Sequence, residues 1–147
     1  MMDVSGKTLS LDDIKEENGL LVVFSCNTCP FVVGGRGEGW EGRYNLLHDQ
    51  CQKQGIGMVL VNSNEAKRDG DDSVEEMRIH SKEMGYTIPY LIDENSKLAN
   101  FYTYTPCEGG AGNDVTTTAS ADGTSGSIAV AVSGWLLSAA ALFAVRL

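Results

Sequence analysis

The sequence predicts an α/β fold built on a central, mostly parallel sheet. Three short, largely apolar runs are typical of buried strands, at residues 20–25, 57–62 and 87–93. The segments between them carry helical periodicity, and strands that alternate with helices indicate a parallel sheet with right-handed crossovers. The chain has 147 residues, of which 42% are hydrophobic, so it is long enough for one domain with a substantial core.

The first long helix is expected in two pieces. Pro30 suits a first helical turn, because its missing N–H would be unpaired there in any case. The glycine-rich stretch "GGRGEGWEGR", residues 34–43, is too costly in backbone entropy for regular helix and predicts a loop. Helix resumes near Trp40 and ends at Gly55. Its apolar face carries three residues at helical spacing: Tyr44, Leu47 and Cys51.

Capping signals place the remaining helices. Ser73 is followed by Glu76 at the spacing of a capping box, and Gly85 closes the helix that Ser73 begins. A short helix is expected over residues 94–102. Near the start of the chain, Ser10 is suited to cap a helical turn in "SLDDIK".

Charge and composition exclude some classes of function. The formal net charge is −9, with acidic residues spread along the chain, which argues against nucleic-acid binding. The first residues lack the basic and apolar regions of a secretory signal, so a cytoplasmic, reducing compartment is the default expectation.

Cys26-Asn-Thr-Cys29 follows the first predicted strand directly, and Pro30 comes next. Unpaired N–H groups at the start of a helix stabilise a thiolate, so we expect the pKa of Cys26 to be lowered. Cys26 would then attack an oxidised sulfur, and Cys29, one turn away, would resolve the mixed disulfide.

Two alternatives remain open for this pair. A structural zinc site needs further ligands at regular spacing. The other cysteines and histidines do not have such a spacing: Cys51, Cys107, His48 and His80. Two inert, buried cysteines are the second alternative. The pattern favours a redox pair, with no metal and no cofactor.

A glycine pattern and two histidines are not expected to form a functional site. Gly37, Gly39 and Gly42 match G-x-G-x-x-G, but a dinucleotide site must follow a strand directly, and the neighbouring glutamates would repel a pyrophosphate. Trp40 and Tyr44 are expected to be packing residues. We expect His48 and His80 to be solvent-facing helix residues, and Cys51 to lie in the core.

Four segments in order resemble a known family: "GKTLSLDDIKEENGLLVVFSCNTCPFV", "GMVLVNSNEAKRDGDDSVEEM", "GYTIPYLIDENSKLA" and "TYTP". They are similar to the thioredoxin-like redoxins, in the alkyl hydroperoxide reductase/thiol-specific antioxidant group, Cys-Asn-x-Cys-Pro branch, over residues 3–106. The resemblance implies a thioredoxin-like three-layer fold and thiol–disulfide, antioxidant chemistry in cell redox homeostasis. It makes Cys26 and Cys29 the redox-active pair, and matches Thr105 and Pro106 to the cis-proline stretch that shapes the substrate groove.

The chain departs from this family after Pro106. The family has a β-hairpin and a final helix there, so we expect the fold to be incomplete at the C-terminal hairpin, with "SIAVAV" as one strand. The organisation implied is a redoxin domain at 1–107, a Gly/Ser/Thr-rich linker at 108–127 and an apolar segment at 128–147. Two interpretations of that segment stay open: a membrane anchor through residues 128–145, or an out-of-family terminus without a selected role.

The expected function is a thiol–disulfide oxidoreductase that cycles Cys26 and Cys29 between dithiol and disulfide. Its partners would be protein or small-molecule disulfides and a thiol reductant. One alternative is a non-catalytic, membrane-tethered thioredoxin-like module. Another is a thiol-dependent peroxidase, although the P-x-x-x-T-x-x-C pattern of true peroxiredoxins is absent before Cys26. The Cys-Asn-x-Cys-Pro branch that this sequence resembles also has a turn at the end of a strand, which matches residues 62–64.

Overall fold

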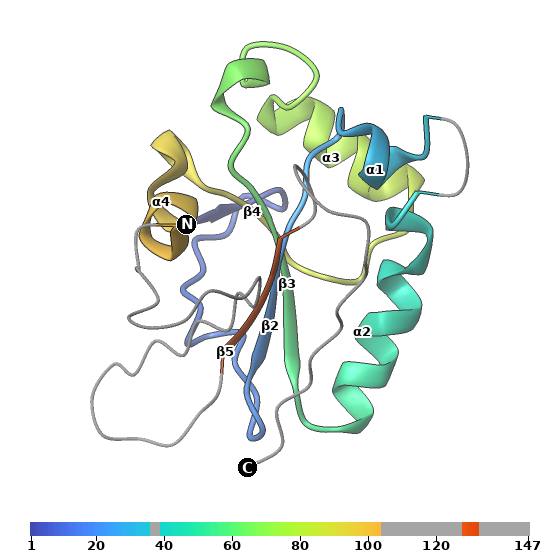
Figure 1. The fold of residues 1–147 in the computed structure, drawn as a ribbon, viewed down its shortest axis with the longest axis vertical. Helices are drawn as coiled ribbons and strands as arrows, with labels where there is room; N and C mark the ends of the chain where they lie inside the picture. Colours follow the sequence, from blue (N-terminus) through green and yellow to red (C-terminus); the bar gives the residue numbers. More distant parts are fainter. Residues whose placement is uncertain (36–38, 104–127, 133–147) are drawn as a thin grey trace, which may run out of the picture.

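The structure is a computed structural model that describes residues 1–35, 39–103 and 128–132 (Figure 1). A five-stranded sheet has the order β1-β4-β3-β2-β5. Among the strands that the structure describes, only the β1–β4 pair is antiparallel, so the sheet is mostly parallel, as predicted. Its strands are β1 (Met2–Asp3), β2 (Leu20–Phe24), β3 (Gly57–Asn62), β4 (Tyr90–Ile92) and β5 (Ile128–Val132).

The three apolar runs form strands where the sequence predicts them, and β1 is an addition. β4 is shorter than the predicted run, because Pro89, which has no N–H to give to the sheet, lies just before it. The two residues of β1 are too few for a sequence signal. Tertiary contacts hold it instead, including the bond from the Tyr90 N–H to the Asp3 carboxylate at 2.9 Å.

The helices lie close to where the sequence predicts them. They are α1 (Pro30–Val33), α2 (Tyr44–Lys53), α3 (Val74–Glu83) and α4 (Lys97–Thr103). Short 3-10 turns, η1 (Glu41–Arg43), η2 (Glu65–Lys67) and η3 (Glu94–Ser96), lie between them. The glycine-rich stretch does end α1, since Gly34 has φ +83°, a conformation that favours glycine. "SLDDIK" forms a short turn capped by Ser10, as the sequence predicts: the Ser10 hydroxyl accepts from the Asp13 N–H, and the Lys15 N–H donates to the Leu11 carbonyl.

Two apolar cores cover the two faces of the sheet. Alternate residues of β3 divide between them: Met58 and Leu60 join the core under α1, α2 and α3, whereas Val59 and Val61 face the opposite side. Figure 1 shows α4 and the N-terminal segment on that opposite side. Both faces of β3 are therefore closed, which explains why all six of its residues are buried.

The strand expected in "SIAVAV" is present as β5. It pairs in parallel with β2, from Leu20 opposite Ile128 to Phe24 opposite Val132. Residues 104–127 and 133–147 lie outside the described residues, so Thr105, Pro106 and the rest of the apolar segment do as well. Within the described ranges, no helix has the length and apolar character needed to cross a bilayer.

Replacing Ser73 with alanine is expected to lower the free energy of unfolding by about 1 kcal/mol. The Ser73 hydroxyl accepts a hydrogen bond from the Glu76 N–H at 3.3 Å, which satisfies one unpaired donor of the first turn of α3. Urea unfolding would measure the change. Ser81→Ala makes the same substitution inside the same helix and should be close to neutral; equal losses from both variants would contradict a capping role.

Candidate functional site

The two predicted cysteines lie in the loop that joins β2 to α1. β2 ends at Phe24, and Ser25 still bonds to the neighbouring strand through its N–H to the Val61 carbonyl at 2.9 Å. Cys29 is the N-cap residue of α1, and Pro30 occupies the first turn, as the sequence predicts. Cys26 and Cys29 are half-buried free thiols. The motif thus lies at the carboxyl end of a parallel strand, where α/β proteins commonly place their sites.

The pKa of Cys26 is raised, which corrects the expectation of a lowered value. Burial is the main cause, and the nearby negative charge of Asp72 adds to it. The backbone N–H groups of Thr28 and Cys29 hydrogen-bond to the sulfur and act in the opposite direction. α1 has only four residues, so its dipole is too short to outweigh the cost of burying a thiolate.

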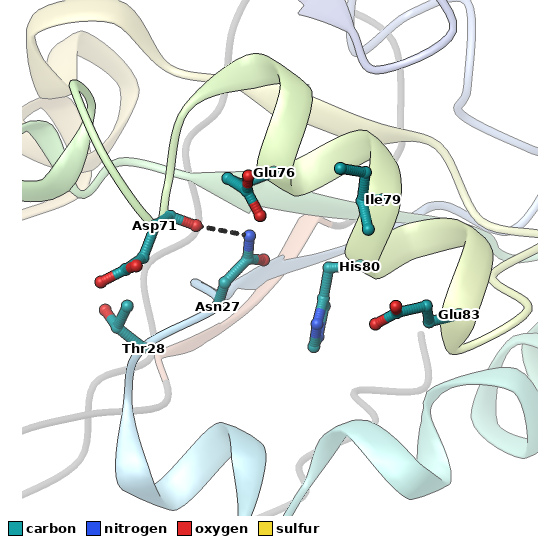
Figure 2. Close-up of a pocket in the computed structure, with 7 residues that line it drawn as sticks. All are labelled: Asn27, Thr28, Asp71, Glu76, Ile79, His80 and Glu83. Atoms are coloured by element: carbon teal, nitrogen blue, oxygen red, sulfur yellow. Dashed lines mark hydrogen bonds between the residues drawn. The ribbon is translucent and has the colours of Figure 1, made fainter.

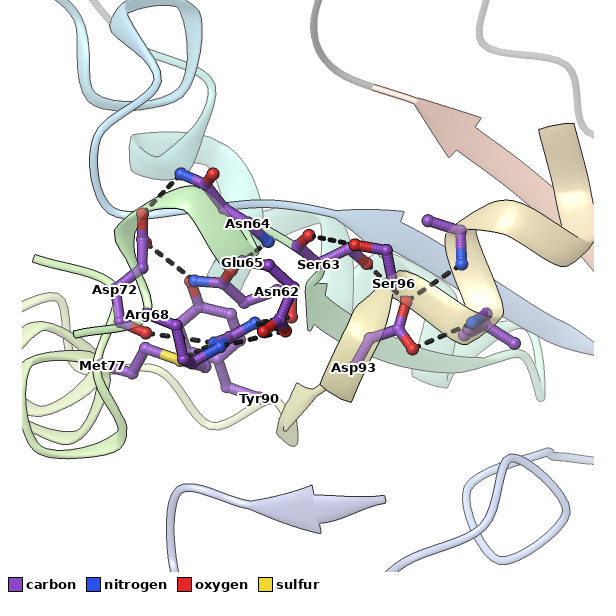
Figure 3. Close-up of polar contacts among 12 residues, drawn as sticks. Asn62, Ser63, Asn64, Glu65, Arg68, Asp72, Met77, Tyr90, Asp93 and Ser96 are labelled. Carbon is purple, nitrogen blue, oxygen red and sulfur yellow. Dashed lines mark hydrogen bonds and ion pairs between the residues drawn. The ribbon is translucent and has the colours of Figure 1, made fainter. Parts of the chain in front are cut away.

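Asp72 joins the cysteine loop to the rest of the protein. Its Oδ1 accepts hydrogen bonds from the Asn27 N–H at 2.7 Å and from Asn62 Nδ2 at 2.8 Å. Its Oδ2 accepts from the Thr28 hydroxyl at 3.1 Å and from Asn64 Nδ2 at 2.7 Å. Figure 3 shows the two asparagines and Asp72 converging in this network. The two residues between the cysteines are therefore held by one carboxylate.

Asn62 and Tyr90 extend the same network beneath the loop. Asn62 Nδ2 also donates to the Tyr90 hydroxyl at 3.3 Å, and that hydroxyl donates to Asn27 Oδ1 at 3.1 Å. Asn27 Nδ2 donates to the Asp71 carbonyl at 2.9 Å. Burial raises the pKa of Tyr90, so its hydroxyl keeps its proton and can donate. Asn27 is thus fixed through its main chain and both ends of its side chain.

The strand-end turn at residues 62–64 acquires a structural role. Asn62 and Asn64 bind Asp72, while the Ser63 hydroxyl between them donates to Asp93 at 2.7 Å. The Asp93 carboxylate also accepts hydrogen bonds from the N–H groups of Leu98 and Ala99, which lie in the first turn of α4. The turn therefore connects the cysteine loop with α4. Its signal in the sequence was the polar run directly after a buried strand.

A pocket of about 240 Å³ opens beside the cysteine loop (Figure 2). Asn27 and Thr28 form one side, and α3 forms another. Among the described residues that line it, three carry carboxylates, namely Asp71, Glu76 and Glu83, and none is a lysine or arginine. The negative potential of these groups disfavours a phosphate or another anion in this pocket.

The two histidines differ from their predicted solvent-facing positions. His48 is buried on α2, and its Nδ1 lies 3.1 Å from the Thr87 hydroxyl. His80 lines the pocket, with its Nε2 2.7 Å from Glu41 Oε2. The polar partner of each ring explains why it is buried or half-buried rather than free on the surface.

The other candidate residues fall into three groups. Cys51 is buried in the core and Tyr44 packs there too, as expected, whereas Trp40 is 39% exposed. Thr105 and Pro106, expected to shape the groove, lie outside the described residues, as do Gly37 of the glycine pattern and Cys107. Among the residues that the structure describes, no three His, Cys, Asp or Glu side chains gather as metal ligands would.

Comparisons with known proteins support the fold without assigning an activity. No protein-family model matches the chain, and no curated protein sequence matches it. It is similar to the crystal structure of an uncharacterized conserved protein from Geobacillus kaustophilus, with 32% identity and a TM-score of 0.62, over 70% of this chain and 52% of that one. It is also similar to a hypothetical protein from Sinorhizobium meliloti, with 30% identity and a TM-score of 0.60, over 69% and 53% of the two chains. The chain thus spans about half the length of these solved structures.

Proposed function

We propose that the protein is a thiol–disulfide oxidoreductase of the thioredoxin-like redoxin type, with Cys26 and Cys29 as its redox-active pair. The observation that carries the proposal is the position of the pair: two half-buried thiols in a loop from a parallel strand to a helix, with the Thr28 and Cys29 N–H groups directed at the Cys26 sulfur. Such N–H groups stabilise the thiolate form that attacks a disulfide.

The reaction exchanges one disulfide for another. The Cys26 thiolate attacks one sulfur of a substrate disulfide, whose S–S bond breaks, and the leaving thiolate takes up a proton. Cys29 loses its proton and attacks the Cys26 sulfur, which breaks the mixed disulfide and releases the second substrate thiol. The substrate gains two electrons and two protons, and the protein becomes a Cys26–Cys29 disulfide. A thiol reductant returns the protein to the dithiol.

Exposed apolar side chains around the motif favour a polypeptide substrate. Phe31 and Val33 of α1 are 66% and 36% exposed, and Trp40 lies near them, since its N–H bonds to the Phe31 carbonyl. Apolar groups of this size on a surface are typical of contact sites for other proteins. These side chains lie on or beside α1, whose N-cap residue is Cys29, so a bound segment would lie close to the thiols.

Mild oxidation is expected to form an intramolecular disulfide between Cys26 and Cys29. Trapping of free thiols in the full chain, followed by peptide mass spectrometry, would identify the linked residues. Cys51→Ser is the matched control, because Cys51 lies in the core and should not change the result. Oxidised protein in which Cys26 and Cys29 both remain alkylatable would refute the proposal.

A further inference from the structure

Asp72 is a fully buried carboxylate that binds the loop between the two cysteines. It is 0% exposed, and each of its oxygens accepts two hydrogen bonds. Two of these bonds come from the loop itself, from Asn27 and Thr28, which lie 45 and 44 residues away in the chain. A group that is distant in sequence therefore sets the conformation of the segment that spaces the thiols.

The hydrogen-bond partners of Asp72 are all groups that donate to its carboxylate oxygens. The N–H of Asn27 and the amide nitrogens of Asn62 and Asn64 can only donate. The Thr28 hydroxyl accepts a hydrogen bond from Asn64 at 3.3 Å and donates one to Asp72 at 3.1 Å. Four donors thus occupy the four acceptor positions of the carboxylate group.

Within the part of the chain that the structure describes, no direct ion pair neutralises the charge on Asp72. The nearby Arg68 guanidinium donates instead to the main-chain carbonyls of Asp72 and Asn62, at 3.1 and 2.9 Å. A thiolate at Cys26 would place a second negative charge beside this one, where partial burial strengthens the repulsion.

We propose that Asp72 is a positioning residue that makes the Cys26–Cys29 pair a reductant, by holding the loop through Asn27 and Thr28 and by withholding charge stabilisation from the Cys26 thiolate. This inference rests on the proposed function. A dithiol/disulfide pair is a strong oxidant when its reduced form is stabilised as a thiolate, and the buried charge of Asp72 acts in the opposite direction. Electrons accordingly flow from Cys26 and Cys29 to the substrate disulfide, with the two thiol protons going to the released thiols.

The test compares Asp72→Asn with the wild-type full chain. The equilibrium between protein dithiol and glutathione disulfide is expected to shift on the order of tenfold toward the protein dithiol, the change that one pKa unit carries. The pH profile of Cys26 alkylation should move to lower pH in the same variant. Asp69→Asn is the matched control, since it removes the same charge from an exposed residue of the same loop and should change neither quantity.

Other outcomes would overturn the inference. Equal shifts of the glutathione equilibrium in Asp69→Asn and Asp72→Asn would mean a general charge effect. No shift in Asp72→Asn would show that Asp72 does not set the redox equilibrium of the pair. If Asp72→Asn does not fold, the test is made on the wild-type protein. The disulfide of a reductant should stay intact in reduced glutathione and be reduced by dithiothreitol. Reduction by glutathione alone would contradict the inference while leaving the proposed function intact. Failure to form any Cys26–Cys29 disulfide would contradict both the inference on Asp72 and the proposed function.

Discussion

Cys26→Ser is expected to abolish disulfide reductase activity, leaving only the uncatalysed rate of the thiol donor. The reaction needs Cys26 to form the mixed disulfide, and a serine hydroxyl does not attack a disulfide under these conditions. The aggregation of reduced insulin chains, with dithiothreitol as donor, would measure the activity. Cys51→Ser should retain it, because that side chain lies in the core.

Cys29→Ser gives the complementary result. Without the resolving thiol, Cys26 still attacks the substrate but the mixed disulfide is not released, so the variant should accumulate covalent complexes with its substrates. Non-reducing electrophoresis and mass spectrometry would detect them at Cys26. Complexes that form at Cys26 in the wild type as readily as in Cys29→Ser would show that Cys29 does not resolve them.

Leu60→Ala is expected to cause the largest loss of stability, about 2–5 kcal/mol. Leu60 is 0% exposed in β3, which has neighbours on both sides, and its side chain packs in the core beneath α1, α2 and α3. A loss of this size is a large fraction of the net stability of a typical domain. Urea unfolding followed by circular dichroism would measure it.

Leu46→Ala provides the control for that measurement. Leu46 is 62% exposed on α2, so the same substitution should change the free energy of unfolding by no more than about 0.5 kcal/mol. Similar losses in the two variants would contradict the assignment of Leu60 to the central core.

Much of the fold could be predicted from local patterns. The strands β2, β3 and β4 follow from apolar runs, and α3 follows from Ser73 and its spacing to Glu76. β1 could not be predicted, because two residues carry no periodicity and depend on contacts with β4. The burial of His48 could not be predicted either, since its partner Thr87 lies 39 residues away.

The candidate site, too, could be predicted from the sequence only in part. The cysteine pair was visible because both thiols, the strand before them and the helix after them are contiguous in the chain. Asp72 was not visible, since it lies in the acidic run "DGDD", which has the composition of a solvated loop. Only its burial and its four hydrogen bonds distinguish it from the exposed Asp69 and Asp71.

The sequence by itself determined the strands β2, β3 and β4, the helices between them and the pair of cysteines, because hydrophobic periodicity, capping residues and motif spacing act over a few residues. The tertiary structure alone decided the raised pKa of Cys26 and the role of the Asn62–Asn64 turn. Burial and charge depend on which distant segments meet, and here the loop before α3 brings Asp72 against the loop that holds the two thiols.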